Sequence, residues 1–508
     1  MKRLLAILLC AVLLAGCTGP GGAYVPTGDG LHQDVPTVPT VPAPEQEQEL
    51  IMVYYPNKSL NPYTSTDFTN RALFPLVYQG LFSVDAQYNV APILCKKYVV
   101  NKDMTVHTFY LENATFSDGT LITAADVVAS LQAAQSGAAY SGRFTQVKSI
   151  LQADDGGVVV TTTTPYENLP ILLDVPIVKA TEVTSERPLG TGAYYYEDSI
   201  AGLRLCRRKS WWCYGNLPVT ASNIPLRQAT SPSQIRDSFQ FEDVGLVCAD
   251  PGSDTYADYR CDFELWDCEN GIFVYIGCNL ESDVFSNAAV RAALTHAIDR
   301  DDLTEHYYGG FARGTTLPAS PQSPYYNTVL ARRYGYAEGA LRAAVESAGM
   351  TDWQITLLVN SDDTMRVRAG RAIAQMLRAE GLKVKLSEVD GKTYRSALKK
   401  GEYDLYLGQT KLSPNMDLSA FFSSKGTLSY GGIADAAMLT LCWDALANAG
   451  NYYTLHQKVM ESGCLVPVLF RSYAVYAQRG VFDSLAPTRD NIFFYTIGKT
   501  MESIQPDA

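Results

Sequence analysis

Residues 274–324 read VYIGCNLESDVFSNAAVRAALTHAIDRDDLTEHYYGGFARGTTLPASPQSP, and the rest of the chain is interpreted around this stretch. An apolar run from Ile272 to Ile276 predicts a buried strand, and a polar turn follows it. Ser286 is expected to cap the next helix, and Gly309-Gly310 ends the segment. The apolar residues at helical spacing are Val290, Ala293, Leu294, Ala297 and Ile298. The stretch therefore predicts a strand and one or two helices packed on a sheet, without catalytic groups.

The start of the chain predicts export and membrane attachment. A basic start, Met1 to Arg3, precedes an apolar run too short to span a membrane, and Leu14-Ala15-Gly16-Cys17 then reads as a lipobox. Residues 1–16 are expected to be a lipoprotein signal peptide, with a lipid on the Cys17 sulfur. The alternative is an ordinary secretory signal with a cysteine there by chance. Residues 17–49 contain the near-repeat Val35-Pro36-Thr37, Val38-Pro39-Thr40, Val41-Pro42-Ala43 and predict a semi-extended tether.

Composition and charge argue against several classes of function. The chain has 508 residues, 47% of them hydrophobic, which is enough for more than one core. Loss of Lys2 and Arg3 with the signal changes the formal charge from −12 to −14, and an acidic chain argues against nucleic-acid binding. Of the 11 cysteines, nine remain after Cys10 and Cys17, in no zinc or redox spacing. Cys261 and Cys268 form the local pair to be checked for a disulfide.

Alternating strands and helices predict a parallel sheet in the second half of the chain. The segment Gln354–Val359 reads as a buried strand, and Ser361 to Asp363 caps an amphipathic helix that Gly381 ends. The next expected strands are Lys383–Leu386 and Tyr403–Leu407, with a helix through Leu398 between them. This β-α-β-α-β order is typical of parallel pairing.

Several further motifs carry a family resemblance. Phe116 to Gly119 and Thr123 to Val128 form a turn and a capped helix, and Leu189 to Tyr194 forms a glycine turn. Leu73–Phe82 reads as a helix and turn, and Cys464–Ala477 as a return segment. Together with residues 274–324, these motifs resemble the family 5 solute-binding proteins, the extracytoplasmic peptide-binding components of ABC importers. The resemblance covers nearly everything after Leu50.

The resemblance implies an α/β fold with two lobes, mixed sheets flanked by helices and a ligand cleft between the lobes. Lobe I is expected to be discontinuous, and the chain crosses between the lobes near residues 265–275 and 465–470. The expected divisions are 50–74, 181–268 and 466–508 for lobe I, 75–180 for a subdomain inserted in it, and 269–465 for lobe II.

Nothing in the sequence indicates catalysis. No G-x-S-x-G, H-E-x-x-H or P-loop pattern occurs, and none of the five histidines has metal spacing to another ligand. No catalytic residue, metal site or cofactor is therefore predicted. A secreted hydrolase or a structural surface lipoprotein is the competing class, and it lacks a recognisable nucleophile and base.

The resemblance places the lobe II side of the cleft at residues 407–417. The candidate ligand-binding residues there are Gly408, Gln409, Thr410, Lys411, Leu412 and Asp417. Leu412 stands where peptide binders of the family place the aspartate that pairs with the ligand's α-ammonium. A buried ammonium without an anion is costly. Either another carboxylate, with Asp417 as the shifted candidate, supplies the charge, or the ligand has no free N-terminus there.

The remaining candidate ligand-binding residues are Asn61, Tyr63, Trp266 and Asp267. Arg366 and Arg368 lie at the start of a predicted helix and could reach a ligand carboxylate, but a solvated surface position is the preferred interpretation. The expected function is capture of di- or oligopeptides and delivery to ABC permease subunits by a monomer held at the outer face of the membrane. The alternative is a non-peptide solute, such as an oligosaccharide or a metal chelate.

Overall fold

The computed structural model describes residues 50–213, 217–251, 259–349 and 354–505. These residues belong to one compact unit. The predicted signal peptide, Cys17 and the whole of the predicted tether lie outside the described residues. Within the described ranges, no helix has the length and apolar character needed to cross a bilayer.

A mixed seven-stranded sheet organises the fold, in the order β11-β17-β12-β16-β14-β15 with β13 also paired to β17. Its strands are β11 (Leu246–Ala249), β12 (Glu264–Cys278), β13 (Ala312–Gly314), β14 (Gln354–Asn360), β15 (Lys383–Val389), β16 (Leu405–Lys411) and β17 (Leu465–Ala477). β14 pairs in parallel with both β15 and β16, which confirms the predicted parallel unit. The strand expected at Ile272 to Ile276 is the second half of the longer β12.

Helices cover this sheet where the sequence predicted apolar faces. They are α5 (Ala288–Leu294), α6 (Arg300–Asp302), α8 (Ala340–Ser347), α9 (Thr364–Ala379) and α10 (Gly391–Lys400). Val290, Leu294 and Ile298 are fully buried, as their spacing predicted. The predicted N-cap is wrong by one residue. The Asn287 side chain accepts from the N–H groups of the first turn of α5, while the Ser286 hydroxyl donates to the Asp283 carbonyl.

The arginine of the Ala-Ile-Asp-Arg motif is buried among backbone carbonyls. Arg300 is 6% exposed and makes six hydrogen bonds. The acceptors are the carbonyls of Thr295, Ile298, Thr315 and Pro467 and the hydroxyl of Thr295. Burial lowers the pKa of Arg300 to about 10. The guanidinium joins the start of α6 to β17 and to the loop after β13.

A second group of sheets is built mainly from the first half of the chain. One has the order β1-β10-β9-β8, with β1 (Met52–Tyr54), β8 (Tyr194–Ser199), β9 (Gly202–Arg207) and β10 (Asn223–Gln228). Another has the order β4-β5-β7-β6, with β4 (Cys95–Val100), β5 (Val106–Leu111), β6 (Val147–Gln152) and β7 (Val158–Thr162). β2 (Phe82–Val84) and β3 (Val90–Pro92) form a hairpin. The helices here are α1 (Phe68–Arg71), α2 (Phe74–Val77), α3 (Ala124–Ser136) and α4 (Pro232–Gln240).

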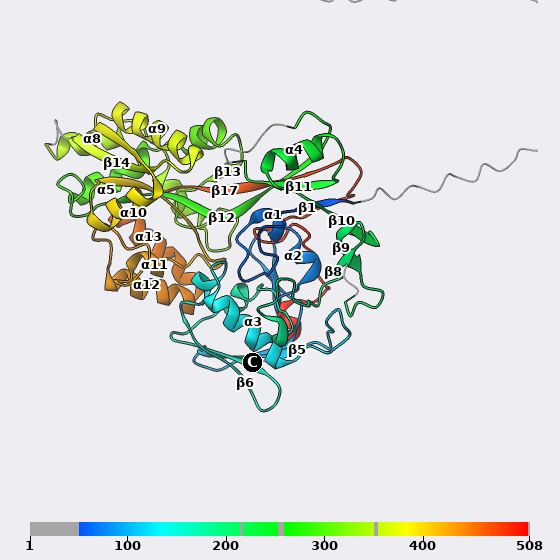
Figure 1. Cartoon of the computed structure of the whole chain (residues 1–508). Helices are drawn as coiled ribbons and strands as arrows, with labels where there is room; N and C mark the ends of the chain where they lie inside the picture. Colours follow the sequence, from blue (N-terminus) through cyan, green and yellow to red (C-terminus); the bar gives the residue numbers. More distant parts are fainter. Residues whose placement is uncertain (1–49, 214–216, 252–258, 350–353, 506–508) are drawn as a thin grey trace, which may run out of the picture. The chain divides into compact units, whose positions relative to one another are not determined.

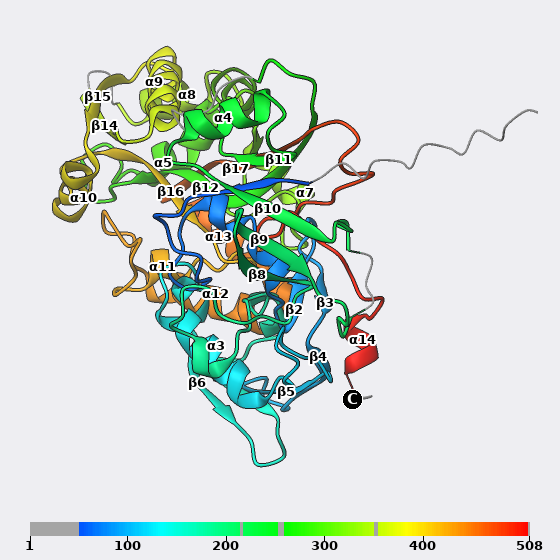
Figure 2. The same cartoon turned by 45° about the vertical axis from the view of Figure 1, so that its right-hand side comes forward.

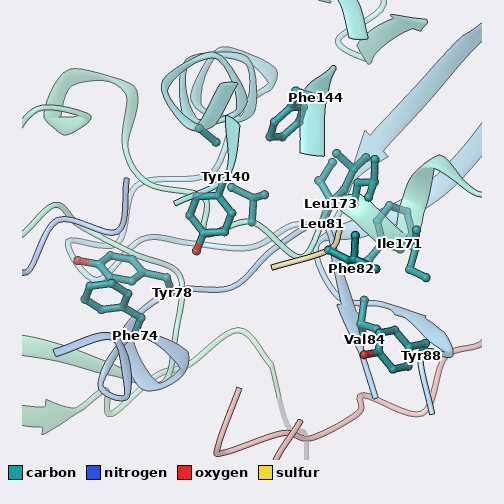
Figure 3. Close-up of a cluster of buried hydrophobic side chains, with 14 of the residues drawn as sticks. Phe74, Tyr78, Leu81, Phe82, Val84, Tyr88, Tyr140, Phe144, Ile171 and Leu173 are labelled. Atoms are coloured by element: carbon teal, nitrogen blue, oxygen red, sulfur yellow. The ribbon is translucent and has the colours of Figure 1, made fainter. Parts of the chain in front are cut away.

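The core between α3 and these sheets is aromatic and aliphatic. Figure 3 shows Phe82 beside Leu81 and Leu173, all fully or almost fully buried. The helix α3 begins at the predicted capping box, because the Asp126 carboxylate accepts from the Thr123 N–H and hydroxyl at 2.8 and 2.6 Å. The capping box thus fixes the start of the helix over this core.

Two long strands connect the two halves of the molecule. β12 and β17 pair antiparallel from Glu264–Ala477 to Gly277–Leu465, with a break in register between Glu269 and Phe273. In Figures 1 and 2 both strands run from the side of β14 to the side of β11. The fold is thus the predicted two-lobed α/β architecture. The exact lobe and subdomain boundaries stay predictions.

The remaining helices are α7 (Thr328–Ala331), α11 (Ser419–Phe422), α12 (Ala436–Ala447), α13 (Tyr452–Ser462) and α14 (Met501–Ile504). The possible Cys261–Cys268 disulfide is absent, and both thiols are free. Much of the segment between them is the extended start of β12. An extended strand rises about 3.3 Å per residue, so Glu264 and Cys268 alone are about 13 Å apart. A disulfide tolerates at most about 7 Å between Cα atoms.

Candidate functional site

Three adjoining cavities lie around Arg71, and segments from both predicted lobes line the first two. The first, of about 570 Å³, is lined by residues 65–71 and 138–145 from one side and by residues 410–428 from the other. The second, of about 230 Å³, reaches the β12 break at Asn270. The third, of about 80 Å³, is lined by α2 and by residues 488–495, which follow β17. Arg71 lines all three cavities, so they form one candidate site.

A single carboxylate at this site is shared by three cations. Asp490 accepts from Lys411 Nζ at 2.5 Å, from Arg143 Nη2 at 2.9 Å and from Arg489 Nε at 3.0 Å. Arg143 also pairs with Asp174. Burial alone would raise the pKa of Asp490, but the three cations outweigh it and hold the pKa well below its ordinary value. Asp490 is therefore a carboxylate at any physiological pH.

Lys411 extends into the space between the lobes. Its side chain is 44% exposed, yet protein surrounds it closely enough for burial to lower its pKa to about 8, against the opposing effect of Asp490. Lys411 was predicted as a cleft residue, and it lines the first two cavities. It remains mostly protonated at neutral pH.

Two arginines complete the basic side of the site. Arg71 donates to the carbonyls of Pro62 and Ser65 and to the Tyr140 hydroxyl, and within the described ranges it forms no ion pair. The Arg489 side chain is only 7% exposed, and its Nη1 is buried without a hydrogen-bond partner. Arg489 lines the first two cavities, and Arg71 lies beside it there.

The lobe II segment predicted to form the cleft divides into two parts. Thr410, Lys411, Leu412 and Asp417 line the first cavity. Gly408 and Gln409 do not line any of the three: Gly408 packs against the Tyr275 ring, and the Gln409 side chain accepts from Arg471 at 3.3 Å.

The surroundings of Leu412 and Asp417 show which residue could pair with the α-ammonium of a peptide. Leu412 is 4% exposed, and its N–H donates to the Gly271 carbonyl at 3.1 Å. Asp417 is half-buried and accepts from the N–H and hydroxyl of Ser419 at 2.8 and 2.7 Å. Burial raises the pKa of Asp417. The cavity therefore has a carboxylate on its wall although position 412 does not supply it.

The other predicted ligand residues lie outside the linings of these cavities. Asn61 donates to the carbonyls of Val183 and Ser185, and the Tyr63 hydroxyl donates to the Pro176 carbonyl. Both side chains thus brace neighbouring loops. On β12, Trp266 is half-buried, and Asp267 pairs with Arg313 at 3.3 Å. Their roles in ligand binding stay predictions.

The expected surface position of Arg366 is wrong. Arg366 is 8% exposed, and its Nε has no hydrogen-bond partner. Its Nη2 lies 3.7 Å from Asp363, the N-cap of α9. Asp363 also belongs to an ion-pair network, in which Arg471 of β17 contacts Asp363 at 3.2 Å and Asp250 at 2.9 Å. This network joins segments of the two predicted lobes behind the cavities.

The described residues contain no group of three or more histidine, cysteine, aspartate or glutamate side chains that would hold a metal ion. His107 contacts the Tyr98 hydroxyl at 2.8 Å, and His296 contacts the Gly335 carbonyl at 2.7 Å. Both rings are thus hydrogen-bonded to other parts of the fold.

The sequence did not indicate Asp490 or the three arginines of the site, Arg71, Arg143 and Arg489. Arg71 and Arg143 lie about 350 or more positions before Arg489, and only the return of the chain after β17 brings them together. The one local signal is the polar run Thr488 to Asn491 in an otherwise apolar C-terminal region.

Comparison with known proteins agrees with this architecture. The profile of "Bacterial extracellular solute-binding proteins, family 5 Middle" matches residues 89–429. The glutathione-binding protein GsiB of Salmonella typhi is 24% identical over 360 residues, which are 65% of this chain and 67% of that protein.

Solved structures show the same fold. The oligopeptide-binding protein AppA from Bacillus subtilis, in complex with a nonapeptide, has a TM-score of 0.60 at 19% identity and covers 89% of this chain and 99% of its own. NikA from Brucella suis, in complex with Fe(III)-EDTA, has a TM-score of 0.69 at 18% identity and covers 87% of this chain and 98% of its own.

Proposed function

Because this chain belongs to family 5 of the bacterial extracellular solute-binding proteins, we propose that it captures peptides between its lobes and delivers them to an ABC importer. The family is one of substrate-binding transport proteins, and capture of this kind needs no catalytic group. What it needs is an enclosed site that removes the solute from water and satisfies its polar groups.

One observation carries the proposal of a peptide ligand: the first cavity has charged groups of both signs on its walls. Lys411, Arg71 and Arg489 line it, and so does Asp417. A free peptide presents a carboxylate at one end and an ammonium at the other. Asp417 would pair with the ammonium in place of residue 412, and the cations would receive the carboxylate. Leu412 would then contact the peptide without carrying its charge.

Names of related proteins support a peptide and leave one alternative. GsiB is named for glutathione, and the AppA structure holds a nonapeptide. The NikA structure holds Fe(III)-EDTA, a polycarboxylate chelate. The excess of cations beside Asp490 favours a metal chelate as the second candidate for this chain. An uncharged oligosaccharide has no such support.

The location and partners complete the proposal. Cleavage before Cys17 and lipidation of its sulfur would anchor the protein outside the cytoplasmic membrane, with residues 17–49 as the tether. The proposed partners are the solute and the permease subunits of an ABC transporter. The protein would act as a monomer and would not bind nucleic acid.

A thermal-shift screen tests the proposed function. The purified chain is heated with di- to hexapeptides, sugars and metal chelates, and a ligand at 100 times its Kd stabilises the native state by about 2.7 kcal/mol. Free peptides should raise Tm, and Asp417→Asn should weaken that shift, while the control Asp283→Asn, at an exposed side chain, should not. A shift with chelates alone would favour the second candidate. No shift with any of the three classes would reject solute capture.

A further inference from the structure

We propose that Arg489, supported by Arg71 and Lys411, binds a carboxylate of the solute, so that the solute must carry at least one carboxylate. The inference rests on the proposed function and deepens it, because it assigns a chemical class to the ligand and a specificity-determining residue to the site. It is carried by three observations: unbalanced charge, unused donors on the Arg489 guanidinium and cavity walls that this side chain helps to form.

The charges around Asp490 do not balance. Four cations lie together at the joined cavities, namely Arg71, Arg143, Lys411 and Arg489. The carboxylates in contact with them are Asp490 and Asp174. Of the other carboxylates that line the cavities, Asp250 is paired with Arg471 and Asp417 is held by Ser419. An anion that enters beside Arg489 would relieve the repulsion among these cations.

The buried Glu269 does not supply the missing anion. Its two carboxylate oxygens accept from the hydroxyls of Tyr88 and Ser320 at 2.6 and 2.7 Å, and it forms no salt bridge with Arg489. Among the described residues, the only ion pair of Arg489 is the one between its Nε and Asp490.

Arg489 keeps hydrogen-bonding capacity that the protein does not use. A guanidinium has five N–H donors in a planar fork that matches a carboxylate. The only hydrogen bond from Arg489 among the described residues is the one from Nε to Asp490, and Nη1 is buried without a partner. Leaving such a donor unpaired is expensive. Nη2 likewise has no hydrogen bond among the described residues, and a ligand carboxylate at the cavity wall would accept from it.

The backbone beside Arg489 is shaped around its guanidinium. Gly271 lies at the register break of β12 with φ +74°, and a Cβ there would be 2.7 Å from Arg489 Cζ. The absence of a side chain at Gly271 therefore lets the planar group lie against the strand. The same Cβ would be 2.8 Å from Nη1, so Nη1 lies against strand β12 and the rest of the side chain lines the cavities.

A matched peptide library tests the carboxylate requirement. The full chain in mild detergent is equilibrated with a tripeptide library randomised at all three positions, and with the same library amidated at the C-terminus. Retained peptides are identified by mass spectrometry, and the Kd of the best ones is measured by calorimetry. Arg489→Met is compared with wild type. Arg371→Met, at an exposed arginine paired with Glu388, is the matched control.

We expect the protein to retain peptides with a free C-terminus. From the amidated library we expect it to retain only members that contain Asp or Glu. Arg489→Met should weaken binding by about 10- to 100-fold, and Arg371→Met should leave it unchanged. Exclusive retention of Asp or Glu members in both libraries would assign the carboxylate to a side chain. Equal retention of neutral capped members would overturn the inference and leave peptide capture intact.

The melting temperature of the ligand-free protein provides the second measurement. It separates a failure of the inference about Arg489 from a failure of the proposed peptide function. Arg489→Met should lower Tm no more than Arg371→Met does, because Asp490 keeps Lys411 and Arg143 as partners while the variant removes an unsatisfied donor and one excess charge. A fall larger than that of Arg371→Met would mark Arg489 as structural and overturn the inference. If no peptide is retained, the proposed peptide function fails, and this comparison still decides the role of Arg489.

Discussion

Replacement of Arg300 by lysine should destabilise the protein strongly, although the charge is kept. The arginine side chain reaches five acceptor atoms with six hydrogen bonds. A lysine ammonium has three donors, so at least two acceptors would lose their partner. Hydrogen bonds to a charged group contribute about 1.5–3 kcal/mol each, which gives a loss of about 3–6 kcal/mol.

Burial adds to this loss in the lysine variant. It already lowers the pKa of Arg300 to about 10, from an ordinary value of 12.5. A lysine starts from about 10.4, so the same environment favours its neutral form closer to physiological pH. The neutral amine makes weaker hydrogen bonds to the same carbonyls. The lost stability should therefore not recover through repacking of the shorter side chain.

Urea denaturation followed by tryptophan fluorescence measures the effect. The matched control is Arg371→Lys, because Arg371 is exposed and its contact with Glu388 contributes at most about 1 kcal/mol. The reasoning is refuted if the free energy of unfolding falls in Arg300→Lys by less than about 1 kcal/mol beyond its fall in this control. Water would then satisfy the carbonyls, and the arginine of the motif would not be what joins α6 to β17.

Three further predictions concern the site and the strand behind it. Burial raises the pKa of Glu269, so its protonated form stabilises the native state below the ordinary pKa of 4.5, and that contribution is lost as pH rises through the raised value. Glu269→Gln should flatten this part of the dependence of Tm on pH. Asp490→Asn should destabilise the ligand-free protein by about 3–5 kcal/mol in urea, because three cations lose their shared anion; a small loss would mean that solvent already screens them. Gly271→Ala should cost about 1–3 kcal/mol of stability and weaken peptide binding, because the new Cβ meets the Arg489 guanidinium; unchanged calorimetric affinity would contradict the proposed contact.

The parts of the fold that depend on local pattern could be predicted from the sequence. The buried face of α5, the capping box at Thr123 and the parallel unit around β14 follow from periodicity and turn chemistry. The N-cap of α5 was missed by one residue because Ser286 and Asn287 are both good caps, and only the turn geometry decides between them.

The site itself could be predicted only where it lies on one segment. Residues 410–412 were located because the family resemblance places the cleft just after the predicted strand Tyr403–Leu407. The cluster around Asp490 could not be found in this way, because no spacing in the sequence relates Arg71 or Arg143 to it. Arg366 was assigned to the surface because it lies near the start of a helix, and its burial comes from tertiary packing that the local pattern does not show.

The pairing of β12 with β17 has a consequence for the order in which the chain can fold. It joins Trp266 to Val475, which emerges from the ribosome about 200 residues later. β11 also pairs with β17 and must wait for the same strand. The early sheet edges therefore stay unpaired until synthesis is almost finished, so a chaperone that holds nascent chains has a long interval in which to bind them.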